Sequence, residues 1–184
     1  MIVETFPVQS VGQRTIDTPL DRNTPFVSDE AQIFYDREAH GVKQALKENG
    51  KLYAFEKAGP REKLFFDPNW CKAAILTAGG LCPGLNNVIR GLTETLTKVY
   101  GVPVVYGIPY GYCGLNPALG YTPVRLDENT VDDIHEQGGT ILGSARGKQD
   151  TLIMLETLIR MNINILFCIG GDGTLRAAHD LAQE

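Results

Sequence analysis

The stretch from Ile163 to Leu175 constrains the fold of this chain more than any other. Its first part, Ile163–Ile169, is an apolar segment with the length of a buried strand. A turn with three glycines follows, and a helical pattern begins at Leu175. A strand that leads through a glycine-rich turn directly into a helix is typical of the α/β class, in which a mostly parallel sheet carries helices on both faces.

The turn after this strand is suited to a phosphate group. Glycines let the backbone approach a ligand closely, and the start of a helix presents unpaired N–H groups to an anion. Asp172 is the only acid in the turn, and its carboxylate would repel phosphate unless a cation such as Mg²⁺ lay between them. The simplest ligand is therefore a nucleotide polyphosphate with its metal. For a Gly-Gly pair taken alone, a turn without any ligand remains the alternative.

A second unit of the same kind lies earlier in the chain. The apolar segment Ala73–Ala78 leads into the run Gly79–Gly84, and Asn86 and Asn87 then open a helix. Because doubly wound sheets bind ligands at the carboxyl ends of their strands, two such units predict one shared crevice. The apolar positions of this helix are expected at Val88, Leu92, Leu96 and Val99.

A third turn, Gly143–Gly147, follows a short strand expected at Thr140. It contributes Arg146, whose planar guanidinium suits phosphate oxygens and keeps its charge at any working pH. Lys148 lies close by and either strengthens the attraction of phosphate or is simply a solvated side chain. The three turns together predict a nucleotide-binding site.

The three motifs, in this order and spacing, resemble those of the 6-phosphofructokinase family. They are Thr77–Asn87, Gly143–Gly147 and Gly170–Thr174. The resemblance runs from about Phe55 to the last residue and is closest to the long-chain branch of plants, spirochaetes and trypanosomatids. Gly-Gly-Asp-Gly-Thr alone also resembles NAD kinases and lipid kinases, whereas the Gly-Gly-Leu-Cys-Pro-Gly-Leu-Asn run is far more specific.

The resemblance implies a role for each residue of the turns. Gly79 would line the nucleotide site through its backbone. Arg146 and Gly147 would contact the polyphosphate, and Arg146 would act in catalysis by stabilising charge on the transferring phosphoryl group. Asp172 would reach Mg²⁺. The phosphates would be held by Gly171, Asp172, Gly173 and Thr174.

Gly173 bears on the choice of phosphoryl donor. In the family that the chain resembles, the matching position is usually glycine where ATP is the donor and aspartate where pyrophosphate is. A carboxylate about 4 Å from a phosphate charge costs on the order of 4 kcal/mol at an effective dielectric constant of 20, which is roughly a thousandfold in affinity. Glycine leaves room for the α-phosphate of a nucleotide, so ATP is the expected donor.

The implied activity is the ATP-dependent phosphorylation of fructose 6-phosphate to fructose 1,6-bisphosphate in glycolysis. The family's catalytic base belongs to a Thr-Ile-Asp-Asn-Asp-like motif, and no such run occurs in these 184 residues. The helix from Leu175 reaches Glu184 without a glycine or asparagine cap and with a free carboxylate, the wrong charge for a helix C-terminus. The sequence is therefore expected to be a fragment. A pyrophosphate-dependent phosphofructokinase and a catalytically incomplete nucleotide-binding module are the alternatives.

Two regions are expected along the chain. Residues 71–184 should form a Rossmann-like nucleotide-binding α/β domain that is truncated at its C-terminus, and residues 1–70 an irregular N-terminal extension. Trp70 is expected to anchor the approach to the first strand in the core, and Tyr112 either touches the base or anchors a packed loop. Further elements are expected at Glu38–Asn49 (helix), Val102–Ile108 and Tyr121–Leu126 (strands), Val131–Gln137 and Asp150–Met161 (helices).

The composition excludes several classes of function. A net charge of −5 with scattered Lys and Arg residues argues against a nucleic-acid partner. The four cysteines are Cys71, Cys82, Cys113 and Cys168, far apart in the sequence, so neither zinc nor a disulfide framework is indicated. Cys168 reads as a core residue. The chain has no signal peptide and no apolar run of about 18 residues, so a cytoplasmic protein without a membrane partner is expected. Self-association into a homo-oligomer is implied by the resemblance alone.

Overall fold

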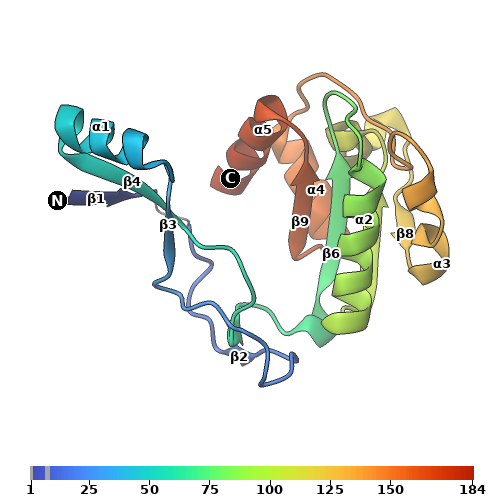
Figure 1. Ribbon diagram of the computed structural model, residues 1–184. Helices are drawn as coiled ribbons and strands as arrows, with labels where there is room; N and C mark the ends of the chain where they lie inside the picture. Colours follow the sequence, from blue (N-terminus) through green and yellow to red (C-terminus); the bar gives the residue numbers. More distant parts are fainter. Residues whose placement is uncertain (1, 7–8) are drawn as a thin grey trace. The chain divides into compact units, whose positions relative to one another are not determined.

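The computed structural model describes residues 2–6 and 9–184 of the chain. These residues form two compact units, which divide between residues 65 and 66. The second unit holds all three glycine-rich turns, and Figure 1 shows it as a sheet with helices around it. Its strands are β6 (Lys72–Thr77), β7 (Val104–Ile108), β8 (Val124–Leu126) and β9 (Ile165–Ile169). Its α-helices are α2 (Leu85–Glu94), α3 (Glu128–Val131), α4 (Thr151–Met161) and α5 (Asp172–Gln183).

The four strands of the second unit form one sheet in the order β8-β7-β6-β9. β6 pairs in parallel with β7 on one side and with β9 on the other, whereas β8 is antiparallel to β7. The expected α/β fold with a mostly parallel sheet is therefore confirmed.

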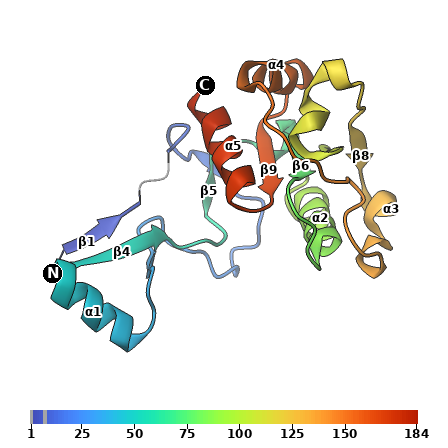
Figure 2. The ribbon, with the colours of Figure 1, turned by 90° about the horizontal axis from the view of Figure 1, so that it is seen from above.

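Helices cover both faces of this sheet, as the sequence predicts. Successive side chains of a strand point to opposite faces, and β6 is apolar at both sets of positions because it is covered on both sides. Ala73 and Ile75 pack with Ile89 of α2, whereas Ala74 and Leu76 pack with Met154 and Leu158 of α4. Figure 2 shows α2 and α4 on opposite sides of β6.

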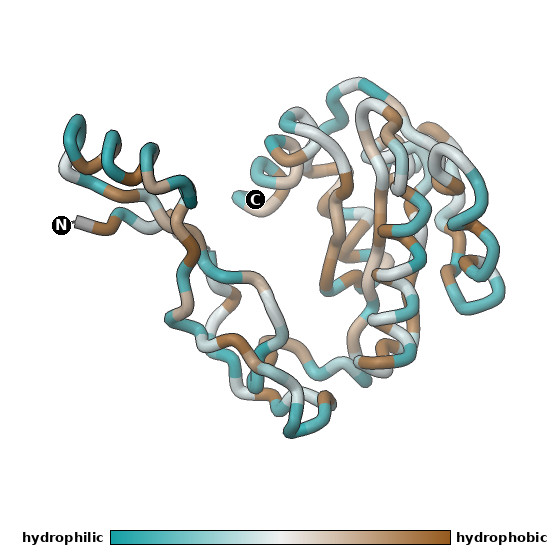
Figure 3. The backbone as a smooth tube through the Cα atoms, in the orientation of Figure 1, coloured by the Kyte–Doolittle hydropathy of each residue, from teal (hydrophilic) through white to brown (hydrophobic). Residues whose placement is uncertain are grey.

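The hydropathy of the chain follows this layering. All of β9 is apolar, and Figure 3 shows its tube in brown, whereas the turns of the surrounding helices alternate between brown and teal. β9 is half-buried along its whole length and pairs on one side only, with β6.

The buried face of α2 lies three residues earlier than the sequence pattern suggested. Val88 and Val99 are 46% and 49% exposed. The helix instead buries the positions at spacings of four, four and three that start at Leu85, and a π-helical turn, Thr95–Val99, continues it. Two series with the same spacing fit this sequence, and the contact of Ile89 with the sheet decides between them. The buried series is Leu85, Ile89, Thr93 and Leu96.

The strand expected at Thr140 is wrong. Residues 140–143 form a turn in which Gly143 N–H donates to Thr140 O over 3.1 Å and Leu142 N–H donates to Thr140 Oγ1 over 3.2 Å. These local bonds use the N–H groups that a sheet ladder would need. Two other expectations were too long: the strand at Tyr121–Leu126 begins at Val124, and the helix at Val131–Gln137 is replaced by α3 and a 3₁₀ turn, Ile134–Glu136.

Trp70 does not anchor the core. It lies in a 3₁₀ turn, Pro68–Trp70, that precedes β6, and its side chain is 81% exposed. The neighbouring Cys71 takes the buried position instead. Asp67 explains the turn, since its side chain accepts the Asn69 N–H over 3.0 Å and Pro68 fixes the first residue.

The first unit is more regular than the irregular extension expected from the sequence. It has a three-stranded sheet in the order β1-β4-β3, an antiparallel strand pair and one helix. The helix ends at Gly50, whose left-handed φ of 65° suits glycine. The sequence does not predict these strands, because they are short and the prolines between them are typical of irregular structure. The elements are β1 (Ile2–Thr5), β2 (Ile16–Asp17), β3 (Gln32–Phe34), α1 (Ala39–Asn49), β4 (Lys51–Glu56) and β5 (Lys63–Leu64).

None of the helices in the described part of the chain has both the length and the apolar character needed to cross a membrane.

Candidate functional site

The strands β6 and β9 end side by side, at the point in the sheet where the strand order reverses. Thr77 pairs with Ile169 at the ends of these parallel strands, and Ala78 N–H donates to Ile169 O over 2.9 Å. From β6 the chain passes through α2 to β7 on one side, whereas α4 leads to β9 on the other. Such a switch point in the strand order opens a crevice at the carboxyl ends of the strands.

A cleft of about 550 Å³ lies at this switch point. Its size falls in the usual range for small-molecule sites, about 300–1,000 Å³. All seven residues that the sequence predicts as site residues line it, and they come from three separate turns. They are Gly79, Arg146, Gly147, Gly171, Asp172, Gly173 and Thr174. Of the longer run after β6, only Gly79 and Gly80 reach the cleft.

The N-terminus of α5 forms one wall of the cleft. Helix α5 begins at Asp172, three residues before the position expected from the sequence, and Gly171 at its N-cap offers no side-chain hydrogen bond. The first N–H groups of a helix have no partner within the helix, so an uncapped N-terminus is suited to an anion. Twelve residues of aligned peptide dipoles add a partial positive charge at this end.

Glycine is needed at two positions just after the ends of β6 and β9. Gly79 has φ of +88°, a left-handed conformation that other residues rarely adopt. At Gly170 a Cβ atom would lie 2.4 Å from Ala78 O and 2.3 Å from Thr174 Oγ1. The chain just after β6 and the first turn of α5 can therefore approach each other only because residue 170 has no side chain.

The turn that carries Arg146 has no strand of its own and is held by polar side chains. The buried Asn86 accepts the Ile141 N–H over 2.8 Å and donates to Gln137 O over 3.1 Å. Ser144 Oγ donates to Gly79 O over 2.6 Å. Arg146 itself is exposed and lines the cleft together with Lys148.

The cleft also contains charged residues that the sequence did not single out. Helix α5 contributes Arg176 and Asp180 to the lining in addition to Asp172. Residues four apart lie on one face of a helix, so counting from Asp172 in steps of four would have found both. With Arg146 and Lys148, the cleft has three cationic side chains against two carboxylates, a locally basic site in a chain of net charge −5.

Tyr112 anchors a packed loop that forms part of the wall of the cleft. It lies in a 3₁₀ turn, Gly111–Leu115, is 7% exposed, and its hydroxyl donates to Thr174 O over 2.8 Å. Burial raises the pKa of the Tyr112 phenol, so it stays protonated as a donor. Tyr112 lines the cleft together with Met154 and Ala177, and these three residues give part of the wall an apolar surface.

The cysteines of the second unit are free thiols. Cys168 is half-buried and packs against the cluster that covers the α4 face of the sheet, and burial raises its pKa. Cys168 therefore contributes to the packing of the core, as expected, although it is not fully buried.

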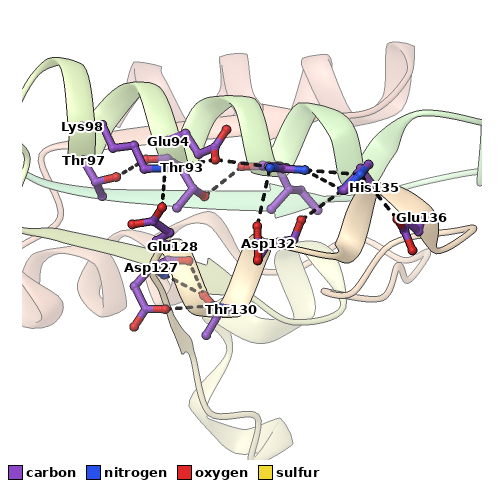
Figure 4. A network of polar contacts seen from close by, with 12 residues as sticks. Thr93, Glu94, Thr97, Lys98, Asp127, Glu128, Thr130, Asp132, His135 and Glu136 are labelled. Carbon is purple, nitrogen blue, oxygen red and sulfur yellow. Dashed lines mark hydrogen bonds and ion pairs between the residues drawn. The ribbon is translucent and has the colours of Figure 1, made fainter.

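A separate polar network lies on the opposite face of the sheet, along α2 and its π-helical turn (Figure 4). Lys98 contacts Glu94 at 3.3 Å and Glu128 at 2.8 Å, and Arg90 contacts Glu94 at 3.5 Å and Asp132 at 3.7 Å. The hydrogen bonds and charge of Lys98 lower the pKa of Glu94. Each cation here already has an acidic partner, so this network explains helix packing rather than ligand binding.

Comparison with known proteins identifies the same family as the sequence motifs. The family model for phosphofructokinase matches residues 72–184. An ATP-dependent 6-phosphofructokinase of Borreliella burgdorferi is 43% identical over 97% of this chain and 41% of its own length. An ATP-dependent 6-phosphofructokinase of Entamoeba histolytica is 44% identical over 96% of this chain and 39% of its own length. The chain thus spans about two fifths of the length of these relatives.

Solved structures agree with this result. The T-state phosphofructokinase of Pichia pastoris superposes with a TM-score of 0.55 over 73% of this chain and 15% of its own, at 29% identity. A pyrophosphate-dependent phosphofructokinase of Marinobacter aquaeolei, at 20% identity, shares the fold with a TM-score of 0.54 over 61% of this chain and 29% of its own. The family match extends from the first strand of the parallel sheet to the last residue and includes every turn that lines the cleft. The chain belongs to the phosphofructokinase family.

Proposed function

We propose that the full-length protein phosphorylates fructose 6-phosphate to fructose 1,6-bisphosphate with ATP, and that the cleft between β6, β9 and α5 receives the ATP. The observation that carries this proposal is the common position of the three glycine-rich turns in one cleft. The names of the relatives, ATP-dependent 6-phosphofructokinase, support the reaction. Arg146, Gly147 and the start of α5 would bind the polyphosphate, and Gly79 would line the site through its backbone.

Phosphoryl transfer asks mostly for positioning and for neutralisation of negative charge. The N–H groups at the start of α5 and the guanidinium of Arg146 lie in the same cleft, so both can act on the same phosphate chain. Arg146 would stabilise the charge on the transferring group, and the N–H groups of Asp172 and Gly173 would orient its neighbours.

Asp172 would hold Mg²⁺, which supplies charge neutralisation on the phosphates when bound. In the described residues no three His, Cys, Asp or Glu side chains converge as a metal cage. Mg²⁺ bound with a nucleotide needs only one or two carboxylates, because phosphates and water fill the other positions. The carboxylate of Asp172, the first residue of α5, therefore fits this ion.

These 184 residues contain no Thr-Ile-Asp-Asn-Asp-like run, the motif that would carry the base for the sugar hydroxyl. We place the base and the residues that bind the sugar phosphate in the part of the relatives' length that this chain does not cover. We also propose that residues 71–184 act as the nucleotide-binding domain and residues 1–70 as an extension, in a cytoplasmic enzyme that forms homo-oligomers.

The test is a coupled assay of ADP release by the full-length protein. ADP release should depend on fructose 6-phosphate, and replacement of ATP by pyrophosphate should abolish turnover. Asp172→Asn removes the proposed metal-binding charge without changing the shape of the side chain. It should lower kcat by about a thousandfold, because Mg²⁺ is then no longer held and the negative charge of the phosphates is not neutralised.

Glu156→Gln is the matched control for loss of one exposed carboxylate. Glu156 lies on α4 outside the cleft, so this variant should keep wild-type turnover. Unchanged turnover in Asp172→Asn would reject the metal role. Nucleotide binding by the wild-type protein without any turnover would instead favour the catalytically incomplete binding module.

A further inference from the structure

A chain of hydroxyl groups joins the end of β6 to the turn that carries Arg146. Thr77 Oγ1 donates to Gly143 O over 2.7 Å and lies 2.9 Å from Thr140 Oγ1. Since a hydroxyl has one hydrogen, Thr140 must be the donor between the two threonines. Leu142 N–H donates in turn to Thr140 Oγ1. The four groups form a continuous, directional series in which neighbouring bonds strengthen each other.

Ser144 adds the bond that is nearest to the cleft. Its hydroxyl donates to Gly79 O over 2.6 Å and so joins the two turns directly. Gly79 lines the cleft, and the residues that follow Ser144, Ala145 and Arg146, line it from the other turn. The bond also gives the Gly79 carbonyl oxygen a donor from within the protein.

These polar bonds replace the ladder that a strand would have supplied. Residues 140–147 belong to no helix or strand, and Arg146 is exposed. An exposed arginine on such a turn loses considerable side-chain and backbone freedom when it binds phosphate. A turn that is already held in place reduces that cost.

We infer that Ser144 is a positioning residue of the nucleotide site, which holds the turn of Arg146 against Gly79 so that both meet one polyphosphate. This inference rests on the proposed function. Ser144 acts through Arg146 and does not itself line the cleft.

The experiment measures the affinity of the full-length protein for a non-hydrolysable ATP analogue with Mg²⁺, by calorimetry. Ser144→Ala should raise the Kd about tenfold, the upper range for one hydrogen bond. Ser144→Thr keeps the hydroxyl and should stay within about threefold of wild type. In an Arg146→Ala background, Ser144→Ala should cost less than about threefold, because the group that it positions is gone.

Thr97→Ala is the matched control. Thr97 Oγ1 donates to Thr93 O over 2.8 Å along α2 and its π-helical turn (Figure 4), and neither residue lines the cleft, so this variant loses the same kind of bond outside the site. Its affinity should stay within about twofold of wild type. The inference is overturned if Ser144→Ala binds as tightly as wild type, if its loss persists undiminished without Arg146, or if Thr97→Ala loses as much.

The affinity test is separate from the test of the reaction. If the wild-type protein binds the analogue but does not turn over fructose 6-phosphate, the proposed function fails, and the role of Ser144 is still decided by the affinities. If turnover is normal and Ser144→Ala leaves the affinity unchanged, only the role of Ser144 fails.

Discussion

At Gly173 the cleft has room for a side chain. A Cβ atom built there meets no heavy atom within 4 Å, and the backbone does not have the positive φ that only glycine tolerates. Replacement of Gly173 therefore does not disturb packing. An aspartate at this position would act through its charge, in the second residue of α5 and next to the proposed phosphate positions.

Gly173→Asp should raise the KM for ATP by at least about a hundredfold, through repulsion between the carboxylate and the phosphates. Gly173→Ala, which adds a methyl group without charge, should change it by less than about threefold. Steady-state kinetics of the full-length protein measures both, and thermal unfolding should show both variants folded. Equal KM values for the two variants would mean that this residue does not select the donor by charge.

Individual site residues were predictable wherever a turn followed an apolar strand. Gly79 and Asp172 lie two and three residues after the ends of β6 and β9, so their place at the carboxyl ends of parallel strands follows from the pattern alone. Arg176 and Asp180 were missed because the helix was expected to start at Leu175. Once α5 begins at Asp172, these residues fall one and two turns later on the cleft face.

At the scale of elements, the strongly periodic segments were predicted well. The strand β6 and the helix α4 lie within one residue of the expected bounds, since apolar spacing and the cap at Asp150 define them. β9 begins two residues later than expected, at Ile165. The start of α5 was predicted three residues too late, because glycines favour a turn. The first turn of this helix nevertheless includes Gly173.

The segment at Thr140 could not be predicted from its own sequence. Its backbone is fixed by the Asn86 amide, by the Thr77 hydroxyl and by Tyr110 N–H, which donates to Leu142 O over 2.8 Å. These partners lie more than 30 residues away along the chain. A β-branched residue followed by two apolar ones favours a strand locally, and tertiary hydrogen bonds override that preference here.

Asp150 gives a direct test of how α4 is built. Its carboxylate accepts the Leu152 N–H over 2.9 Å and the Ile153 N–H over 3.3 Å, an N-cap that satisfies two free donors. Asp150→Ala should lower the free energy of unfolding by about 1 kcal/mol in urea denaturation. Asp150→Asn keeps an accepting oxygen and should lose much less. A similar loss in both variants would assign the effect to charge at the helix start instead of capping.

At the scale of the whole molecule, burial is distributed very unevenly between the two units. Among the described residues of the first unit only Leu52 and Ala54 are buried, and α1 buries none. The unit relies on stacked rings, Phe6 on Phe55 with centroids 4.8 Å apart, and on an ion pair between Arg61 and Glu56 at 2.9 Å. The second unit has an apolar cluster on each face of its sheet.

This difference should appear in native-state amide hydrogen exchange of the 184-residue chain. Local opening requires less free energy where few apolar contacts must be broken. Amides of β4 should therefore exchange at least about a hundredfold faster than those of β6, which is fully buried at Ala73, Ala74, Ile75 and Leu76. Added salt should widen the gap, because the ion pairs of the first unit are partly exposed and are screened. Equal protection of β4 and β6 at every salt concentration would show that the two units unfold together, and the burial of each unit alone would then not set its stability.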